Sequence, residues 1–193
     1  MLTKTINLYT IQELEKINPD GYAHAYQQYC NSVSEYAWYD EVIRSIEKFL
    51  DLFDCKLEDF CLNSYRNDFD YSEKSYYRPW NDDEETELEM DELAGSRLKN
   101  YLLATCKNEI DKWDDCPLGG IWIDIELLEP FHQFVTGEKY QDYTLQDLIN
   151  TSLQQALDNV NDDYDSQFTE ERFVENSDEN DYYYDIDGNL TFL

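Results

Sequence analysis

Large apolar residues recur at steps of three and four along the segment from about Glu35 to Phe53. Such spacing places side chains on one face of a helix, so it predicts a long helix that packs against a core. The residues on this face are Trp38, Val42, Ile46, Phe49 and Phe53. Thr10 precedes Glu13 by three positions, and this capping box predicts a shorter helix that ends at about Ile17.

Several other segments have helical spacing. The tyrosines between Tyr22 and Tyr29 predict a helix that is separated from the first one by a break at residues 18–21. Further helices are predicted from Leu93 to about Lys112, from Thr144 to Val160 and from Thr169, with a short helix or strand from Ile121 to Phe131 after a loop at residues 113–120.

Alternating apolar and polar residues indicate strands. Residues 5–9 alternate as a short strand, and residues 55–71 predict one or two strands with a turn near Asn67-Asp68. At the carboxyl end, residues 182–186 and 189–192 flank Asp187-Gly188, a pair typical of the type I′ turn of a β-hairpin. The predicted class is therefore α+β: several amphipathic helices packed on a small, mostly antiparallel sheet, with a C-terminal β-hairpin.

The length and composition are those of a folded chain. With 193 residues, 41% of them hydrophobic and 16% aromatic, the chain has enough apolar surface for a core, unlike an aromatic-poor acidic tail. No domain linker is evident, so we expect a single domain over residues 1–193. Residues 82–92 contain eight acids in eleven positions, which predicts a flexible acidic segment at 72–92.

Negative charge is the dominant feature of the composition. Against 44 Asp and Glu there are only 14 Lys and Arg, giving a net charge of −30. Residues 113–193 contain 20 of the acids and two of the bases. Direct binding of nucleic acid or of an anionic membrane is disfavoured, because both require Lys and Arg to neutralise phosphates.

The chain is expected to be cytoplasmic. No apolar run approaches the roughly 20 residues that span a bilayer, and the first residues have no apolar core of a signal peptide. Five cysteines, an odd number without a C-x-x-C pair, are typical of reduced thiols.

The sequence has no recognisable catalytic or metal-binding motif. Only His24 and His132 are present, in no metal-ligand context, and no phosphate-binding glycine motif occurs. Asp124-x-Glu126 has the form of an acid/base pair, but pairs of this kind arise by chance among 44 acids. The run from Asn159 to Glu170 has oxygen side chains at calcium-loop positions, with Tyr164 in place of the required glycine. We therefore predict no enzyme activity, no cofactor and no metal.

Two acid-rich clusters are the candidate binding residues, and aromatic residues lie beside both. Tyr76-Tyr77 precede the first cluster and Tyr182-Tyr183-Tyr184 follow the second. Aromatic rings among carboxylates suit a cationic partner, although alternate tyrosines of a strand also pack inward. The first cluster consists of Asp82, Asp83, Glu84, Glu85, Glu87 and Glu89, and the second of Asp162, Asp163, Asp165, Asp178, Glu179 and Asp181.

Four short motifs carry a resemblance to a known group of proteins. They are Leu8-Tyr9-Thr10-x-x-Glu13-Leu14, Trp38-Tyr39-Asp40-Glu41, Cys116-Pro117-Leu118-Gly119-Gly120 with Asp124 after it, and Tyr184-Asp185-x-Asp187-Gly188. Through them the chain resembles a loose group of uncharacterised small acidic proteins encoded by bacteriophages and prophages. The resemblance implies a phage or mobile-element setting inside a bacterial host, where acidic proteins often look like DNA mimics.

The first functional hypothesis is therefore an acidic inhibitor. Its carboxylates would replace phosphates on the positively charged nucleic-acid-binding surface of a host defence or DNA-processing protein, as in a DNA mimic of the anti-CRISPR or anti-restriction type. The alternative is an adaptor or antitoxin-like partner of a basic protein, without DNA mimicry. A third hypothesis is a carboxylate enzyme with a divalent metal. The oligomeric state stays open.

Overall fold

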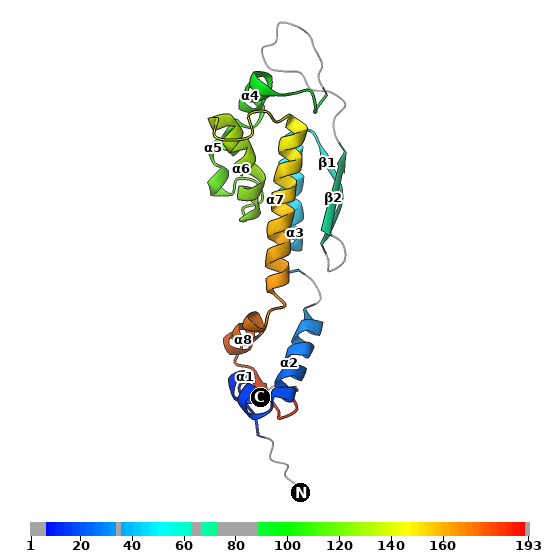
Figure 1. The fold of residues 1–193 in the computed structure, drawn as a ribbon, viewed down its shortest axis with the longest axis vertical. Coiled ribbons are helices and arrows are strands. Elements are labelled where there is room, and N and C mark those ends of the chain that lie inside the picture. Colours follow the sequence, from blue (N-terminus) through cyan, green and yellow to red (C-terminus); the bar gives the residue numbers. More distant parts are fainter. Residues whose placement is uncertain (1–6, 34–35, 63–66, 73–88, 192–193) are drawn as a thin grey trace. The chain divides into compact units, whose positions relative to one another are not determined.

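The computed structural model describes residues 7–33, 36–62, 67–72 and 89–191. They form two compact units, each with its own contacts. The terminal unit comprises the described residues of 1–37 and 162–193, and the central unit those of 38–161. The described residues combine helices with two antiparallel two-stranded sheets, which confirms the α+β class (Figure 1).

The central unit is built around helix α3. The predicted long helix is present but begins later, because α3 spans Tyr39–Asp51 and the chain turns at residues 52–54. Helix α3 lies between a two-stranded sheet and helix α6 (Figure 1). The other elements of this unit are β1 (Lys56–Leu62), β2 (Asn67–Ser72), α4 (Gly95–Thr105), α5 (Lys107–Asp111), the 3₁₀ turn η1 (Trp113–Asp115), α6 (Ile123–Thr136) and the part of α7 (Leu145–Ser166) before residue 162.

Aromatic rings join α3 to α6 in the central core. Phe49 and Phe53 lie 5.4 Å apart between ring centroids, and Phe131 of α6 lies 5.6 Å from Phe49 and 5.0 Å from Phe53. All three side chains are fully buried. Edge-to-face and stacked rings at these distances add to the stabilisation that comes from area burial. Of the predicted stripe, Val42, Ile46, Phe49 and Phe53 are therefore confirmed as core residues, whereas Trp38, just before α3, is 48% exposed and does not belong to the core face.

The predicted strand region forms an antiparallel pair. Strand β1 pairs with β2 in a register that places Phe60 opposite Phe69 and Asp59 opposite Asp70, with an irregularity between residues 57 and 59. Asn67 and Asp68, near which a turn was predicted, are the first two residues of β2. Residues 63–66, which connect the strands, lie outside the described part.

A buried carboxylate holds the loop at residues 116–120 in the central unit. Asp124 is fully buried, and its Oδ2 atom accepts hydrogen bonds from the backbone N–H groups of Leu118 (2.8 Å) and Gly120 (2.9 Å). Lys48 of α3 donates to the carbonyl of Leu118 (2.7 Å). The loop predicted at 113–120 is thus ordered by side chains from α3 and α6, and its first residues form the turn η1.

Three predictions about element bounds need correction. The segment from Leu93 to Lys112 is two helices, since Cys106 has a non-helical backbone conformation between α4 and α5. Helix α6 continues past Pro130 to Thr136, because its apolar residues on both sides of the proline are buried. The break predicted at residues 18–21 is shorter than expected: only Asn18, which is not helical, separates Ile17 from α2 (Pro19–Ser32). Pro19 is the first residue of α2, a position where the backbone N–H that proline lacks would have no partner within the helix.

The terminal unit is built around Phe173 of α8 (Glu170–Glu179). Tyr22, Tyr26 and Tyr29 of α2 surround this ring at centroid distances of 5.7, 5.6 and 5.3 Å. Helix α1 (Ile11–Ile17) packs on the same core and has the predicted capping box at Thr10 and Glu13. The tyrosines that predicted a second helix are therefore a core stripe.

A hairpin closes the terminal unit. Strand β3 (Tyr183–Tyr184) pairs with β4 (Leu190–Thr191), as predicted. Only Gly188 of the Asp187-Gly188 pair has a positive φ, so the predicted type I′ turn is wrong. The turn instead depends on the Asp185 side chain, whose Oδ1 accepts the N–H groups of Asp187 (3.0 Å) and Asn189 (2.9 Å). Of the strand predicted at residues 5–9, residues 5 and 6 lie outside the described part, residues 7 and 8 do not belong to a strand, and Tyr9 forms a single bridge with Tyr184.

Candidate functional site

The first acid cluster is mostly outside the described residues. Asp82, Asp83, Glu84, Glu85 and Glu87 fall within residues 73–88, as do Tyr76-Tyr77 and most of the segment predicted to be flexible. Glu89 is described and exposed, and its backbone N–H donates to the carboxylate of Glu92 (3.2 Å).

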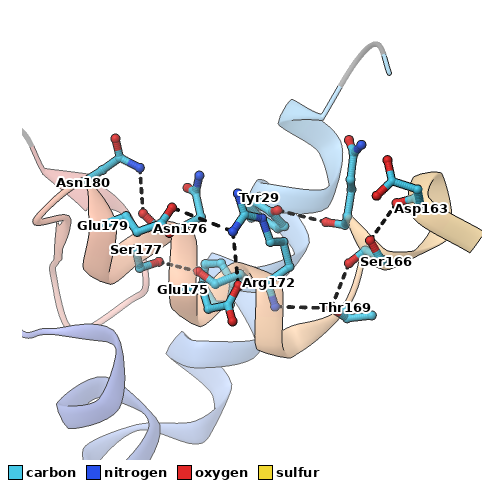
Figure 2. Close-up of polar contacts among 12 residues, drawn as sticks. Tyr29, Asp163, Ser166, Thr169, Arg172, Glu175, Asn176, Ser177, Glu179 and Asn180 are labelled. Atoms are coloured by element: carbon cyan, nitrogen blue, oxygen red, sulfur yellow. Dashed lines mark hydrogen bonds and ion pairs between the residues drawn. The ribbon is translucent and has the colours of Figure 1, made fainter. Parts of the chain in front are cut away.

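The second cluster lies in the terminal unit, at the two ends of α8. Asp162, Asp163 and Asp165 lie in the last turns of α7, whereas Asp178 and Glu179 end α8 and Asp181 follows it. Figure 2 shows Asp163 and Glu179 at opposite ends of the view. Ten helical residues rise about 15 Å, which exceeds the Debye length of about 8 Å in physiological salt. The structure thus divides the predicted cluster into two groups.

Three of these six carboxylates make contacts within the unit. The hydroxyl of Tyr36 donates to Asp163 (2.5 Å), and the amide of Gln12 donates to both carboxylate oxygens of Asp178 (2.7 and 2.6 Å). Glu179 forms an ion pair with Arg172 at 3.8 Å. The side chains of Asp162, Asp165 and Asp181 are exposed. These contacts fix the positions of the three carboxylates. Only the charge of Glu179 is partly neutralised, by its ion pair with Arg172.

Two acids that sequence reasoning had missed, Glu171 and Glu175, lie on α8, between the two groups in the sequence. Glu171, Glu175 and Asp178 follow one another at steps of four and three, and all are exposed. They lie on the face of α8 opposite to Phe173 and Ser177, which are buried. We call Glu171, Glu175, Asp178 and Glu179 the α8 acidic face. The sequence signal of this face is the helical spacing of its acids, which a search for consecutive carboxylates does not detect.

One base lies beside this face. Figure 2 shows Arg172 next to Glu175 and Glu179, and the Arg172 guanidinium is 3.1 Å from the Glu175 carboxylate. All three side chains are substantially exposed, and exposed ion pairs contribute little to stability. Helix α8 contains five carboxylates and this single Arg, so the face stays strongly negative.

Acids at the carboxyl end of α8 reduce the stability of this helix. Glu170 and Glu171 lie in the first turn, where negative charge interacts favourably with the helix dipole. Asp178 and Glu179 lie in the last turn, which has no basic residue. Each acid there costs about 0.3–1 kcal/mol at low salt. The contacts of Asp178 with Gln12 and of Glu179 with Arg172 offset part of this cost.

The helix that presents this face is firmly held. The Thr169 side chain caps its first turn by accepting the N–H of Arg172 (3.2 Å). Tyr29 donates to the carbonyl of Gln167 (2.9 Å), just before the helix. The Ser177 hydroxyl lies 2.8 Å from the hydroxyl of Tyr184. The acidic face is therefore displayed on a fixed helix and not on a loop.

The aromatic residues of the second cluster pack mainly inward. Tyr184 is only 4% exposed, and its ring lies 6.3 Å from that of Phe173. Tyr182 and Tyr183 are half-buried, and Tyr182 packs against the same core. For Tyr184, the expectation that alternate tyrosines pack inward is confirmed.

The central unit has a second acidic surface on the β1–β2 sheet. Glu58, Asp59, Asp68 and Asp70 are exposed, and Asp59 lies directly opposite Asp70. The side chain of Asp68 accepts the N–H of Phe69 (2.9 Å), which blunts the edge of β2. Glu58 forms an ion pair with Lys56 (3.2 Å), so the negative charge of this sheet is partly compensated.

The residues weighed for chemistry have structural contacts. Asp124 accepts hydrogen bonds from the loop at 116–120, and the pKa of Glu126 is raised by burial and by Glu129. The calcium-like run lies on helix α7 as far as Ser166, so it does not form a metal-binding loop. Within the part of the chain that is described, no group of three or more metal-binding side chains comes together.

Comparison with known proteins identifies no relative. No protein-family model, no curated protein and no solved structure matches this chain. None of the described helices is both long and apolar enough to cross a membrane. Inferences about function must therefore start from the surface chemistry of the chain itself.

Proposed function

We propose that this protein is an acidic inhibitor that binds a positively charged, nucleic-acid-binding surface of a host defence or DNA-processing protein. The observation that carries the proposal is the α8 acidic face, in which Glu171, Glu175, Asp178 and Glu179 are exposed on one rigid helix. The carboxylates act in place of phosphates, and a partner contacts them with Lys and Arg.

The density of charge on α8 supports this proposal. The four carboxylates of the α8 acidic face lie along about 15 Å of helix, which gives one negative charge per about 4 Å. One strand of B-DNA has one phosphate per about 3.4 Å. After subtraction of Arg172, the face still has about one net charge per 5 Å, so a groove that accepts one DNA strand meets a line of charge of the same order.

The charge of the whole molecule supports fast association. Residues 1–37 and 162–193 contain 15 acidic and three basic side chains, and the whole chain has a net charge of −30. Such a field steers a cationic partner toward the protein, and the effect decreases as salt screens the charges. Binding is therefore expected to weaken steeply with ionic strength.

The test is affinity capture from a bacterial lysate with two variants of equal charge. The first, E171Q/E175Q/D178N/E179Q, removes four charges from the α8 acidic face and keeps the shape of each side chain. The matched control, D111N/D114N/D115N/D142N, removes four exposed charges from the central unit. Captured proteins are eluted with a DNA oligonucleotide and, separately, with salt.

The proposal predicts that the wild type and the control capture the same protein, and that DNA releases it. The α8 variant should capture at least tenfold less, since each ion pair with the partner contributes about 1 kcal/mol or more to binding. Equal capture by both variants would contradict the assignment of the surface. A captured partner that DNA does not displace would instead support an adaptor or antitoxin-like role.

A further inference from the structure

Two exposed isoleucines of the terminal unit, Ile17 and Ile186, are linked through the side chain of Asn18. Ile17 at the end of α1 is 56% exposed, and Ile186 in the hairpin turn is 39% exposed. Asn18, the neighbour of Ile17, donates from its side chain to the backbone carbonyl of Ile186 (2.8 Å). The hydrogen bond brings the backbone of the turn next to the end of α1. We call Ile17 and Ile186 the isoleucine pair.

The turn that carries Ile186 is fixed from several directions. Gly21 and Gly188 approach so closely that a Cβ atom on Gly188 would lie 2.0 Å from the carbonyl oxygen of Gly21. The His24 ring nitrogen Nδ1 lies 2.9 Å from the carbonyl oxygen of Asp187. Because the carbonyls of Ile186 and Asp187 face α2, the turn has little freedom to withdraw its exposed side chain into the core.

The internal hydrogen bonds of the turn add to this rigidity. Asp185 accepts two backbone N–H groups, and both of its oxygens lie within 3.1 Å of the Asn189 amide. These hydrogen bonds hold the pKa of Asp185 below its usual value, chiefly through Asn189, so the carboxylate stays ionised at neutral pH. An apolar side chain at the tip of such a turn is already in place for binding, which lowers the entropic cost of association.

Exposed acids are close in sequence to both residues of the isoleucine pair. Glu13 lies one helical turn before Ile17, Asp20 follows Ile17 by three residues, and Asp187 is next to Ile186. Lys16 is the one base of α1. An apolar centre with an acidic rim matches a partner that has an apolar side chain flanked by Lys and Arg.

From these observations we infer that the isoleucine pair is the apolar anchor site of the terminal unit, and that it binds a basic amphipathic segment of the partner protein. The inference rests on the proposed function, to which it adds a binding site that nucleic acid does not have. A cationic groove can contact only the charges and bases of DNA, whereas on this protein it can contact charges and aliphatic side chains. The isoleucine pair thereby makes the protein prefer a cationic partner that also has an apolar side chain over other cationic proteins.

The test uses two synthetic peptides of equal length and equal positive charge. One alternates Lys with Leu so that a helix has one apolar face, and the other has Ser in place of every Leu. Binding of each labelled peptide is measured by fluorescence anisotropy to the wild type, to I17S/I186S and to W38S. Trp38 is the matched control, because it is 48% exposed and belongs to the central unit.

The wild type should bind the Lys/Leu peptide about tenfold more tightly than the Lys/Ser peptide, as expected for the burial of two partly exposed aliphatic side chains. The I17S/I186S variant should lose this preference and keep its affinity for the Lys/Ser peptide. The W38S variant should behave as the wild type. The conservative I17V/I186V variant should keep most of the preference, and near-ultraviolet circular dichroism of the tyrosines should show that each variant is folded.

The outcomes separate this inference from the proposed function. If I17S/I186S keeps the full preference, or if W38S loses it, the isoleucine pair is not the anchor. If the wild type self-associates in analytical ultracentrifugation and I17S/I186S does not, the pair binds a second copy of the chain and the inference is wrong. If the α8 variant E171Q/E175Q/D178N/E179Q binds the Lys/Ser peptide as tightly as the wild type does, the proposed function fails, whatever the isoleucine pair does.

Discussion

Replacement of Asp124 by alanine tests how the central unit holds its loop at residues 116–120. The Oδ2 atom of Asp124 accepts both the Leu118 N–H and the Gly120 N–H, at 2.8 and 2.9 Å. In D124A both donors lose their acceptor, and that of Leu118 is buried in a residue only 7% exposed. Hydrogen bonds to a charged group contribute about 1.5–3 kcal/mol each.

The expected net loss is smaller than the sum of the two bonds. Alanine also removes the cost of burying a carboxylate whose other oxygen, Oδ1, has no hydrogen-bond partner among the described residues. We therefore expect D124A to lower the free energy of unfolding by about 3 kcal/mol. The central unit spans residues 38–161, a size between those for which 1 kcal/mol shifts Tm by about 4–8 °C and by about 2–4 °C, so we expect Tm to decrease by about 12 °C.

Tryptophan fluorescence follows this unit selectively. All four tryptophans of the chain lie between residues 38 and 161. Thermal unfolding monitored by their emission should therefore shift in D124A.

Two further variants separate hydrogen bonding from charge. D124N keeps an oxygen that can accept both N–H groups and should lose about 1 kcal/mol, mainly because its amide N–H₂ takes the place of the unpartnered Oδ1. D114A removes an exposed carboxylate nearby and should leave Tm almost unchanged. A D124N loss as large as that of D124A would refute the assignment of the stabilisation to the two hydrogen bonds. So would a D124A shift no larger than that of D114A.

Two other predictions concern the terminal unit. G188A should lower its Tm strongly, because Gly188 has a φ of +84° and a Cβ atom would lie 2.0 Å from the Gly21 carbonyl oxygen. G120A in the central unit has the same φ of +84° with no neighbour within 4 Å, so it should cost only about 1 kcal/mol, and equal losses would show that the close approach is unimportant. High pH should also destabilise the terminal unit, because burial, and then the charge of Glu170, raises the pKa of Tyr22 from 10.0 to about 12. The neutral hydroxyl is favoured in the folded state, so this stability is present below pH 10 and is lost as the pH rises through about 12. Burial also raises the pKa of Tyr26 and Tyr29 in this unit, so Y22F should reduce the loss of stability at high pH without abolishing it. Denaturant unfolding at several pH values measures the loss, and an unchanged pH dependence in Y22F would contradict the role of Tyr22.

Local signals in the sequence predicted the elements whose ends depend on neighbouring residues. The capping box at Thr10, the helix starts at Thr144 and Thr169, and the C-terminal hairpin are confirmed, since a side chain three positions away or a short pairing decides each of them. Failures occurred where tertiary contacts override a local preference. The α6 residues around Pro130 are buried against the central core, and this packing outweighs the hydrogen bond that proline removes.

The candidate site shows that local signals in the sequence are also insufficient to predict a charged surface. Counting acids along the chain finds runs, such as that at residues 82–92, but consecutive residues of a helix point in different directions, so a run places only some of its charges on any one face. Glu171, Glu175 and Asp178 are never consecutive, yet their steps of four and three place them together on one face of α8. The residues that reveal the face are Phe173 and Ser177, because their burial fixes which side of α8 meets the solvent. A charged surface of this kind is therefore predictable only after the apolar stripe of the same helix has been found.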